Sequence, residues 1–252
     1  MTENKDPLRL IVALNKTAPS VWRSLFEEIG DAGCCFRVAA AEYGNHSHLV
    51  DLVGYLRDQG KYILIDLRAL ATPESTRQAL QELSRFNVDA YSVSNSQETI
   101  AAARSVAKGA TILTTTVLTT VDEDSAVTPG TREEIEEIVV TLTANALDAG
   151  CDGIITSGIE LPCLRNKFGH DFFALVPGIR DSNGDTLAAD NQKRTVSVEE
   201  AFARGANAIM VGRPITLAKQ PLAALNAIQT RIDAIIDTRI QCSNADPREK
   251  KR

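Results

Sequence analysis

The sequence has little of what marks membrane or exported proteins. No apolar run in its 252 residues approaches the roughly 20 residues that a membrane-spanning helix needs. Its first residues, 1–7, are polar and lack the apolar stretch of a signal peptide. These absences exclude membrane spans as an organising feature, and we expect a cytoplasmic protein.

Excess positive charge is also missing. The chain has 27 Lys and Arg against 33 Asp and Glu, a formal net charge of −6. Nucleic acids and anionic membranes select basic surfaces, so neither is expected as the main partner. A phosphate site here would have to be a local positive pocket on a negative surface.

Metal-binding and disulfide patterns are absent as well. The five cysteines show no CxxC spacing, and we expect them to be reduced and mostly buried. His46 and His48 lie close together, but a metal site needs more ligands than two exposed histidines. We therefore expect no metal and no cofactor.

What the sequence does have is a regular alternation of apolar runs and amphipathic segments. Strands are predicted over residues 8–14, 34–40, 61–67, 88–93, 110–118, 153–156, 172–176 and 206–211. Helices are predicted over 18–29, 49–58, 73–86, 97–106, 131–149, 160–168, 198–204 and 214 to about 238.

Eight strands alternating with helices, without a linker or a break in composition, predict an α/β fold of one domain. We expect a single (β/α)₈ barrel over residues 1–242 and a charged, frayed tail over 243–252. A doubly wound open sheet is the alternative, but no GxGxxG motif follows the first strand.

A candidate anion site follows the last predicted strand. Gly212 would let an oxyanion approach the backbone, and Arg213 would supply a two-pronged cation at the start of a helix. Glycine is common at such joints. Two further segments, 176–180 (VPGIR) and 190–194 (DNQKR), strengthen the prediction of a phosphate grip.

Charged residues also lie within or at the ends of two apolar strands. Asp66 and Arg68 are two positions apart, so their side chains should share a face, and Arg37 on the neighbouring strand could complete a row. Buried charges are costly unless paired or functional. A buried ion network without chemistry remains an alternative, although the carboxyl ends of barrel strands are where chemistry takes place.

These segments resemble the orotidine 5′-phosphate decarboxylase family. The similarity runs from the opening LIVAL (10–14), through TVLTT (116–120) and CDGIITS (151–157), to VPGIR, NQKR (191–194) and VGRP (211–214). The resemblance implies a homodimer that binds a small phosphate ester, a nucleoside 5′-monophosphate. It implies that Gln192, Gly212 and Arg213 hold the phosphate, that Ser157 contacts the pyrimidine, and that Asn15, Ser75, Thr119 and Pro177 line the substrate site.

The resemblance is weakest at the family's catalytic set. Its Lys–Asp–Lys–Asp tetrad reads Arg37–Asp66–Arg68–Ala71 here, its opening aspartate is Asn15, its threonine after the tetrad is Ser75, and its strand-four histidine is Ser94. A guanidinium keeps its proton in proteins, so Arg68 can stabilise an anion but is a poor general acid.

Three functions remain open at this stage. The first is a phosphate-ester-binding relative with altered chemistry on Arg37, Asp66 and Arg68. The second is an authentic orotidine 5′-phosphate decarboxylase with substituted residues, and the third is a non-catalytic nucleotide-binding protein. Glu42 and Glu160 are further candidate carboxylates, but we interpret each as an exposed glutamate at a helix end.

Overall fold

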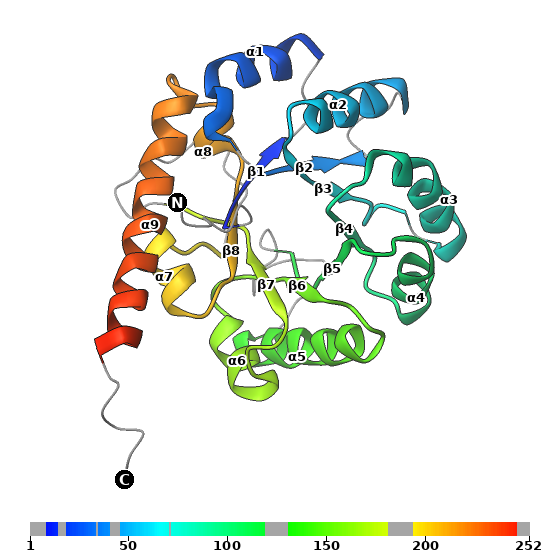
Figure 1. Cartoon of the computed structure of the whole chain (residues 1–252). Coiled ribbons are helices and arrows are strands. Elements are labelled where there is room, and N and C mark those ends of the chain that lie inside the picture. Colours follow the sequence, from blue (N-terminus) through cyan, green and yellow to red (C-terminus); the bar gives the residue numbers. More distant parts are fainter. Residues whose placement is uncertain are drawn as a thin grey trace.

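Eight parallel strands close into a barrel in chain order, with β1 hydrogen-bonded to both β2 and β8 (Figure 1). The computed structural model describes residues 9–14, 19–33, 35–40, 46–70, 72–118, 131–180 and 194–245. The strands are β1 (Leu10–Leu14), β2 (Cys35–Ala39), β3 (Tyr62–Asp66), β4 (Ala90–Val93), β5 (Thr111–Thr115), β6 (Gly153–Ile155), β7 (Phe173–Val176) and β8 (Ala208–Val211).

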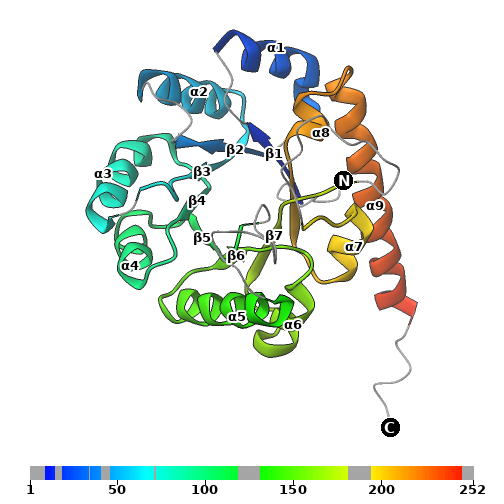
Figure 2. The same ribbon diagram turned by 180° about the vertical axis from the view of Figure 1, so that it is seen from behind.

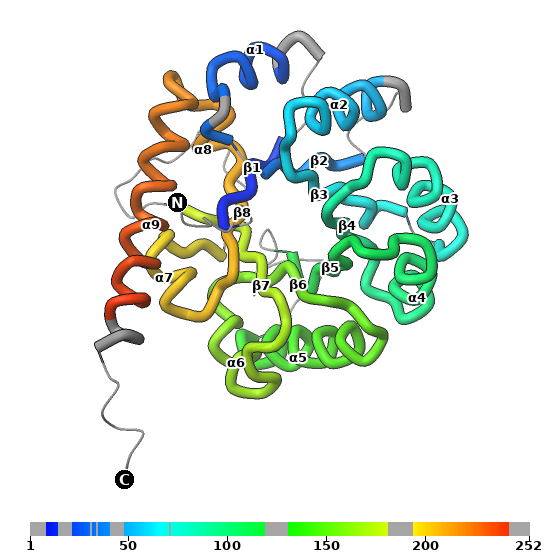
Figure 3. Tube along the Cα trace, viewed as in Figure 1, coloured from blue at the N-terminus to red at the C-terminus, as the bar shows by residue number. Residues whose placement is uncertain are grey.

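Helices surround the barrel on the outside, as the two opposite views and the tube show (Figures 1, 2 and 3). They are α1 (Pro19–Ile29), α2 (His46–Asp58), α3 (Pro73–Leu83), α4 (Gln97–Val106), α5 (Arg132–Asp148), α6 (Leu161–Phe168), α7 (Val198–Ala203), α8 (Arg213–Thr216) and α9 (Pro221–Ala245). Short 3₁₀ turns η1 (Gly30–Ala32) and η3 (Ser84–Phe86) follow α1 and α3. The predicted (β/α)₈ barrel is confirmed.

Strand residues alternate between the inside of the barrel and the layer beneath the helices. Ile11, Cys35 and Leu64 belong to a small inner cluster to which every strand contributes one residue. Their neighbours, such as Val12 and Phe36, belong to the larger core between sheet and helices. Burial on both sides explains why these strands read as continuous apolar runs.

Helix starts follow the capping residues in the sequence. Thr131 and Glu134 form a capping box before α5, and Thr72 accepts a hydrogen bond from the Ser75 backbone N–H before α3. A second capping box, between Ser197 and Glu200, opens α7. These contacts fix where α3, α5 and α7 begin.

The C-terminal helical segment differs from the prediction of one helix from residue 214 to about 238. It consists of two helices, because Pro221 has no N–H and its ring clashes with a preceding helical turn. Pro221 opens α9, which packs against α1, α7 and α8 and continues through Ala245, into the segment expected to be a frayed tail. Within the described residues, no helix has the length and apolar character to cross a membrane.

Candidate functional site

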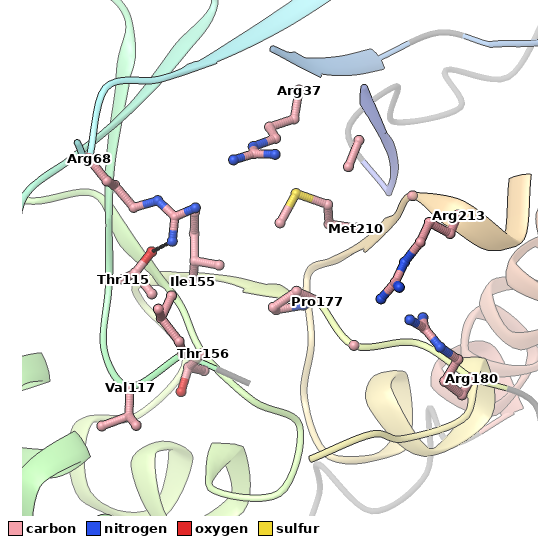
Figure 4. Close-up of a pocket in the computed structure, with 14 residues that line it drawn as sticks. Arg37, Arg68, Thr115, Val117, Ile155, Thr156, Pro177, Arg180, Met210 and Arg213 are labelled. Atoms are coloured by element: carbon pink, nitrogen blue, oxygen red, sulfur yellow. Dashed lines mark hydrogen bonds between the residues drawn. The ribbon is translucent and has the colours of Figure 1, made fainter. Parts of the chain in front are cut away.

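A cavity of about 230 Å³ opens at the carboxyl ends of the strands. Four arginines line it from different elements: Arg37 from β2, Arg68 after β3, Arg180 after β7, and Arg213 at the start of α8. Figure 4 shows them as two pairs, with Arg37 and Arg68 at one end and Arg180 and Arg213 facing each other at the other. The protein's overall negative charge therefore gives way to a positive pocket here.

Asp66, the last residue of β3, is held between Arg37 and Arg68. Arg68 donates from Nε to Asp66 Oδ1 at 2.8 Å and from Nη2 to Oδ2 at 2.5 Å. Arg37 donates to Oδ2 from Nε at 3.1 Å and also from Nη2. The Arg–Asp–Arg row predicted from strand spacing is thus present.

The two arginines control the ionisation of Asp66, which is only 5% exposed. Burial alone would raise the pKa of its carboxyl, but hydrogen bonds from Arg68 and the charges of Arg37 and Arg68 outweigh it. The pKa of Asp66 therefore lies well below its usual range, and the carboxylate remains ionised at neutral pH.

Arg68 also lines a second cavity, of about 370 Å³. Its Nη1 donates to Thr115 Oγ1 at 3.0 Å, a bond drawn in Figure 4. The second cavity shares Arg37, Arg68, Thr115 and Leu118 with the first. It is also lined by Asp66 and by Ser94, which the resemblance would place at the family's histidine position. The guanidinium of Arg68 thus faces two spaces.

The end of the cavity that we expect to hold phosphate has one arginine predicted as a ligand, Arg213, and one that was not, Arg180. Gly212 and Arg213, the predicted phosphate ligands, both line the cavity, and the Gly212 carbonyl accepts the N–H groups of Ile215 and Thr216. Arg180 lies opposite Arg213 (Figure 4), although the resemblance singled out Pro177, and not Arg180, from the VPGIR segment. Its position at the end of the VPGIR segment was the available signal.

The other predicted substrate residues are distributed unevenly. Pro177 lines the cavity. Ser157 is fully buried, its hydroxyl accepts the Ile159 N–H at 3.1 Å, and Thr156 lines the cavity next to it. Ser75 lies in the first turn of α3, where its hydroxyl donates to the Thr72 carbonyl at 2.9 Å, and it lines neither cavity. Outside the described residues lie Asn15, Glu42, Ala71, Thr119 and Gln192.

The interpretation of Glu160 as an exposed helix-end residue is wrong. Glu160 is 6% exposed and forms an ion pair with Arg194, whose Nη1 lies 2.5 Å from Glu160 Oε1. A carboxylate can be buried because a cation accompanies it. Glu160 does not line either cavity, so Asp66 is the only carboxylate among the described residues that line them.

Metal-binding groups are not apparent in the described part of the chain. No three His, Cys, Asp or Glu side chains among these residues are grouped so that they could hold an ion. Cys35 and Cys151 are buried and free, as expected, and Cys163 is half-buried. Burial raises the pKa of the Cys151 thiol to about 11, so this thiol is not poised as a nucleophile.

Comparisons with known proteins agree with the fold and identify the family. Residues 8–228 match the model of the orotidine 5′-phosphate decarboxylase / HUMPS family. The orotidine 5′-phosphate decarboxylase of Methylococcus capsulatus is 35% identical over 224 residues, which cover 89% of this chain and 91% of the relative. The enzyme of the same name from Xanthomonas axonopodis pv. citri is 32% identical over 232 residues, covering 90% and 93%.

A solved structure extends the agreement to three dimensions. The crystal structure of orotidine 5′-phosphate decarboxylase from Lactobacillus acidophilus superimposes with a TM-score of 0.70 at 26% identity, covering 88% of this chain and 98% of the other. The resemblance seen in the sequence motifs is therefore confirmed along nearly the whole chain. The chain belongs to the orotidine 5′-phosphate decarboxylase / HUMPS family.

Proposed function

We propose that this protein binds orotidine 5′-phosphate and decarboxylates it to UMP, more slowly than family members that carry the lysine tetrad. One observation carries the proposal: a single cavity has a pair of arginines at each end. Orotidine 5′-phosphate is anionic at two separate points, its phosphate and its carboxylate. The names of the relatives support this reaction over the altered chemistry that the substituted tetrad suggested.

Arg180 and Arg213 would bind the phosphate. A guanidinium fork matches phosphate oxygens with paired, charge-assisted hydrogen bonds. Gly212 has no side chain to keep the phosphate away from the backbone. Gln192 remains part of this proposal, because the resemblance implies that it binds the phosphate. The resemblance also implies that Ser157 contacts the pyrimidine, and that contact is part of the proposal too.

Arg37, Asp66 and Arg68 would act at the reacting end. The C6–carboxylate bond breaks, CO₂ leaves, and the electron pair stays on C6 until it accepts a proton. Arg68 would stabilise that carbanion electrostatically, as a fixed cation in a pocket can. Because a guanidinium does not release its proton, the proton would come from water. Hydroxide would be the other product of that step, and the reaction should be slow.

A second candidate function is nucleotide binding without turnover. It is favoured by the hydrogen bonds of Arg68, which donates from all three guanidinium nitrogens to Asp66 and Thr115. An arginine held in this way is stabilised in the ground state, and only interactions that strengthen in the transition state accelerate a reaction.

The deciding experiment measures UMP formation from orotidine 5′-phosphate by the protein, purified from a host that lacks its own decarboxylase. Asp66→Asn is the matched background, because it keeps the shape of the side chain and removes its charge. Turnover above that background supports the proposal. Binding of orotidine 5′-phosphate without turnover would establish the second candidate, and absence of both would contradict each function.

A reversion series tests why the reaction is slow. Arg68→Lys alone should restore little, because the lysine would meet an arginine at position 37 and lack the second carboxylate. The combined change Asn15→Asp, Arg37→Lys, Arg68→Lys and Ala71→Asp should raise UMP formation more than the single change, since catalytic groups act as a unit. A single reversion that matched the combined one would contradict this explanation.

A further inference from the structure

Arg194 is a buried arginine at the mouth of the barrel that none of the functions above uses. It directly follows residues 181–193, the segment that contains Gln192, and it is 7% exposed. It does not line either cavity, so it would not touch a ligand there. A buried ion pair such as Arg194–Glu160 adds little net stability compared with packed apolar residues. The role of Arg194 is therefore better inferred from the groups that it contacts than from the stability that the ion pair contributes.

The other arm of Arg194 reaches the chain just after β5. Nη2 donates to the carbonyl oxygens of Val117 at 3.0 Å and Leu118 at 2.9 Å. Both residues line the cavity, and Figure 4 shows Val117 at its wall. Carbonyls beyond the end of a strand have lost their sheet partners and need others. Arg194 supplies them and so fixes this part of the wall.

The residues next to Arg194 in sequence are fixed on the phosphate side. The Arg180 N–H donates to the Val196 carbonyl at 3.0 Å, and the Val196 N–H donates to the Gly178 carbonyl at 3.3 Å. Val196 also packs on Gly158, where an added Cβ would lie only 2.7 Å from a Val196 methyl. The short stretch from Arg194 to Val196 therefore joins the segments that follow β5, β6 and β7.

We propose that Arg194 is a positioning residue of the nucleotide site. Its bonds to the Val117 and Leu118 carbonyls keep the cavity wall after β5 at a fixed position relative to Arg180. The site can then contact the phosphate and the rest of the nucleotide at the same time. The proposal rests on the proposed function. Removal of these bonds should weaken binding of the whole nucleotide more than binding of the nucleoside.

The test compares the affinities of UMP and uridine by calorimetry for the protein and four variants. Arg194→Lys keeps a cation beside Glu160 but cannot reach both carbonyls, and it should lower the UMP preference about tenfold, the size expected for a charged hydrogen bond. Arg194→Met with Glu160→Leu replaces the pair with apolar residues, which usually preserves folding, and should lower the preference similarly. Glu160→Gln keeps the carbonyl bonds and should leave the preference unchanged.

The matched structural control is Arg165→Lys. Arg165 is equally buried, at 7% exposed, and donates to the carbonyls of Gly205 and Phe172 at the opposite end of the barrel. Its replacement should reduce thermal stability and leave the UMP preference unchanged. If the Arg194 variants also kept the full preference, the positioning role would be overturned. If the unmodified protein bound uridine as tightly as UMP, the assignment of the phosphate site would be refuted.

Discussion

At the scale of single residues, the site has more arginines than carboxylates among the described residues that line it. Asp66 receives hydrogen bonds from Arg37 and Arg68, and no second carboxylate lines the cavities among the described residues. The spacing of Asp66 and Arg68 was enough to predict that their side chains lie on the same face, although β3 ends at Asp66 and Arg68 follows it. The contact of Arg194 with Glu160 joins residues 34 positions apart, and no local pattern indicates it.

Arg213 provides the most direct test of the phosphate end. Arg213→Ala should weaken UMP binding by about 1.5–3 kcal/mol, the range for hydrogen bonds to charged groups. Uridine affinity should not change, because uridine has no phosphate for Arg213 to hold. Isothermal titration calorimetry of both ligands on both proteins measures this. Equal UMP affinities would show that Arg213 does not bind the phosphate.

Asp66 should make stability depend on pH in a defined direction. Its pKa is depressed in the folded protein, so its contribution is present above the unfolded value, about 4, and is lost as pH falls below it. We expect the stability difference between the protein and Asp66→Asn to be constant from neutral pH to about pH 5 and to narrow below about pH 4. Urea unfolding across this range measures it. A difference that grew as the pH fell would contradict the pairing.

At the scale of elements, all eight strands lie within the predicted ranges, but several ends differ. The range predicted around β5 was 110–118, whereas the strand covers Thr111–Thr115. The residues after Thr115 are still mostly β-branched, yet the Val117 and Leu118 carbonyls bind Arg194 and not a neighbouring strand. The division between α8 and α9 could have been read from Pro221, a residue suited to the first turn of a helix.

Two glycines make a matched test of element packing. Gly153 opens β6 and lies so close to β7 that an added Cβ would come within 2.0 Å of the Phe173 carbonyl oxygen. Gly153→Ala should therefore destabilise the protein by at least about 1–3 kcal/mol, the usual cost of overpacking. Gly54 lies inside α2, where an added Cβ meets only the Phe86 ring at 3.5 Å.

Gly54→Ala should be neutral or stabilise the protein by about 0.5–1 kcal/mol, because alanine is the better helix former. Denaturant unfolding of both variants gives the two free energies. Equal effects of the same sign would show that the close approach of β6 and β7 does not govern stability at Gly153.

At the scale of the whole molecule, we expect a homodimer, as the resemblance implies. The resemblance implies that the family's cross-subunit aspartate corresponds to Ala71, so we expect apolar packing, and not an ionic link between subunits, to hold the dimer. The dimer should therefore persist as salt is raised, since salt screens exposed charges but not apolar contact. Light scattering at micromolar concentration measures the mass at each salt level. A monomer at moderate salt would refute this expectation.

The closure of the barrel also has a consequence for how the chain is made. β1 pairs with β8, so Leu10 lies beside Ile209, and the strand synthesised first has its final neighbour only when the last strand emerges. Until then the nascent sheet carries an open edge on β1, and open strand edges promote aggregation. A message broken before the codons for Ala208–Val211 would yield a chain with unpaired edges on both β1 and β7. Such a fragment would be bound by chaperones and degraded by proteases. Because the barrel closes through β1 and β8, only a completely translated chain would be stable.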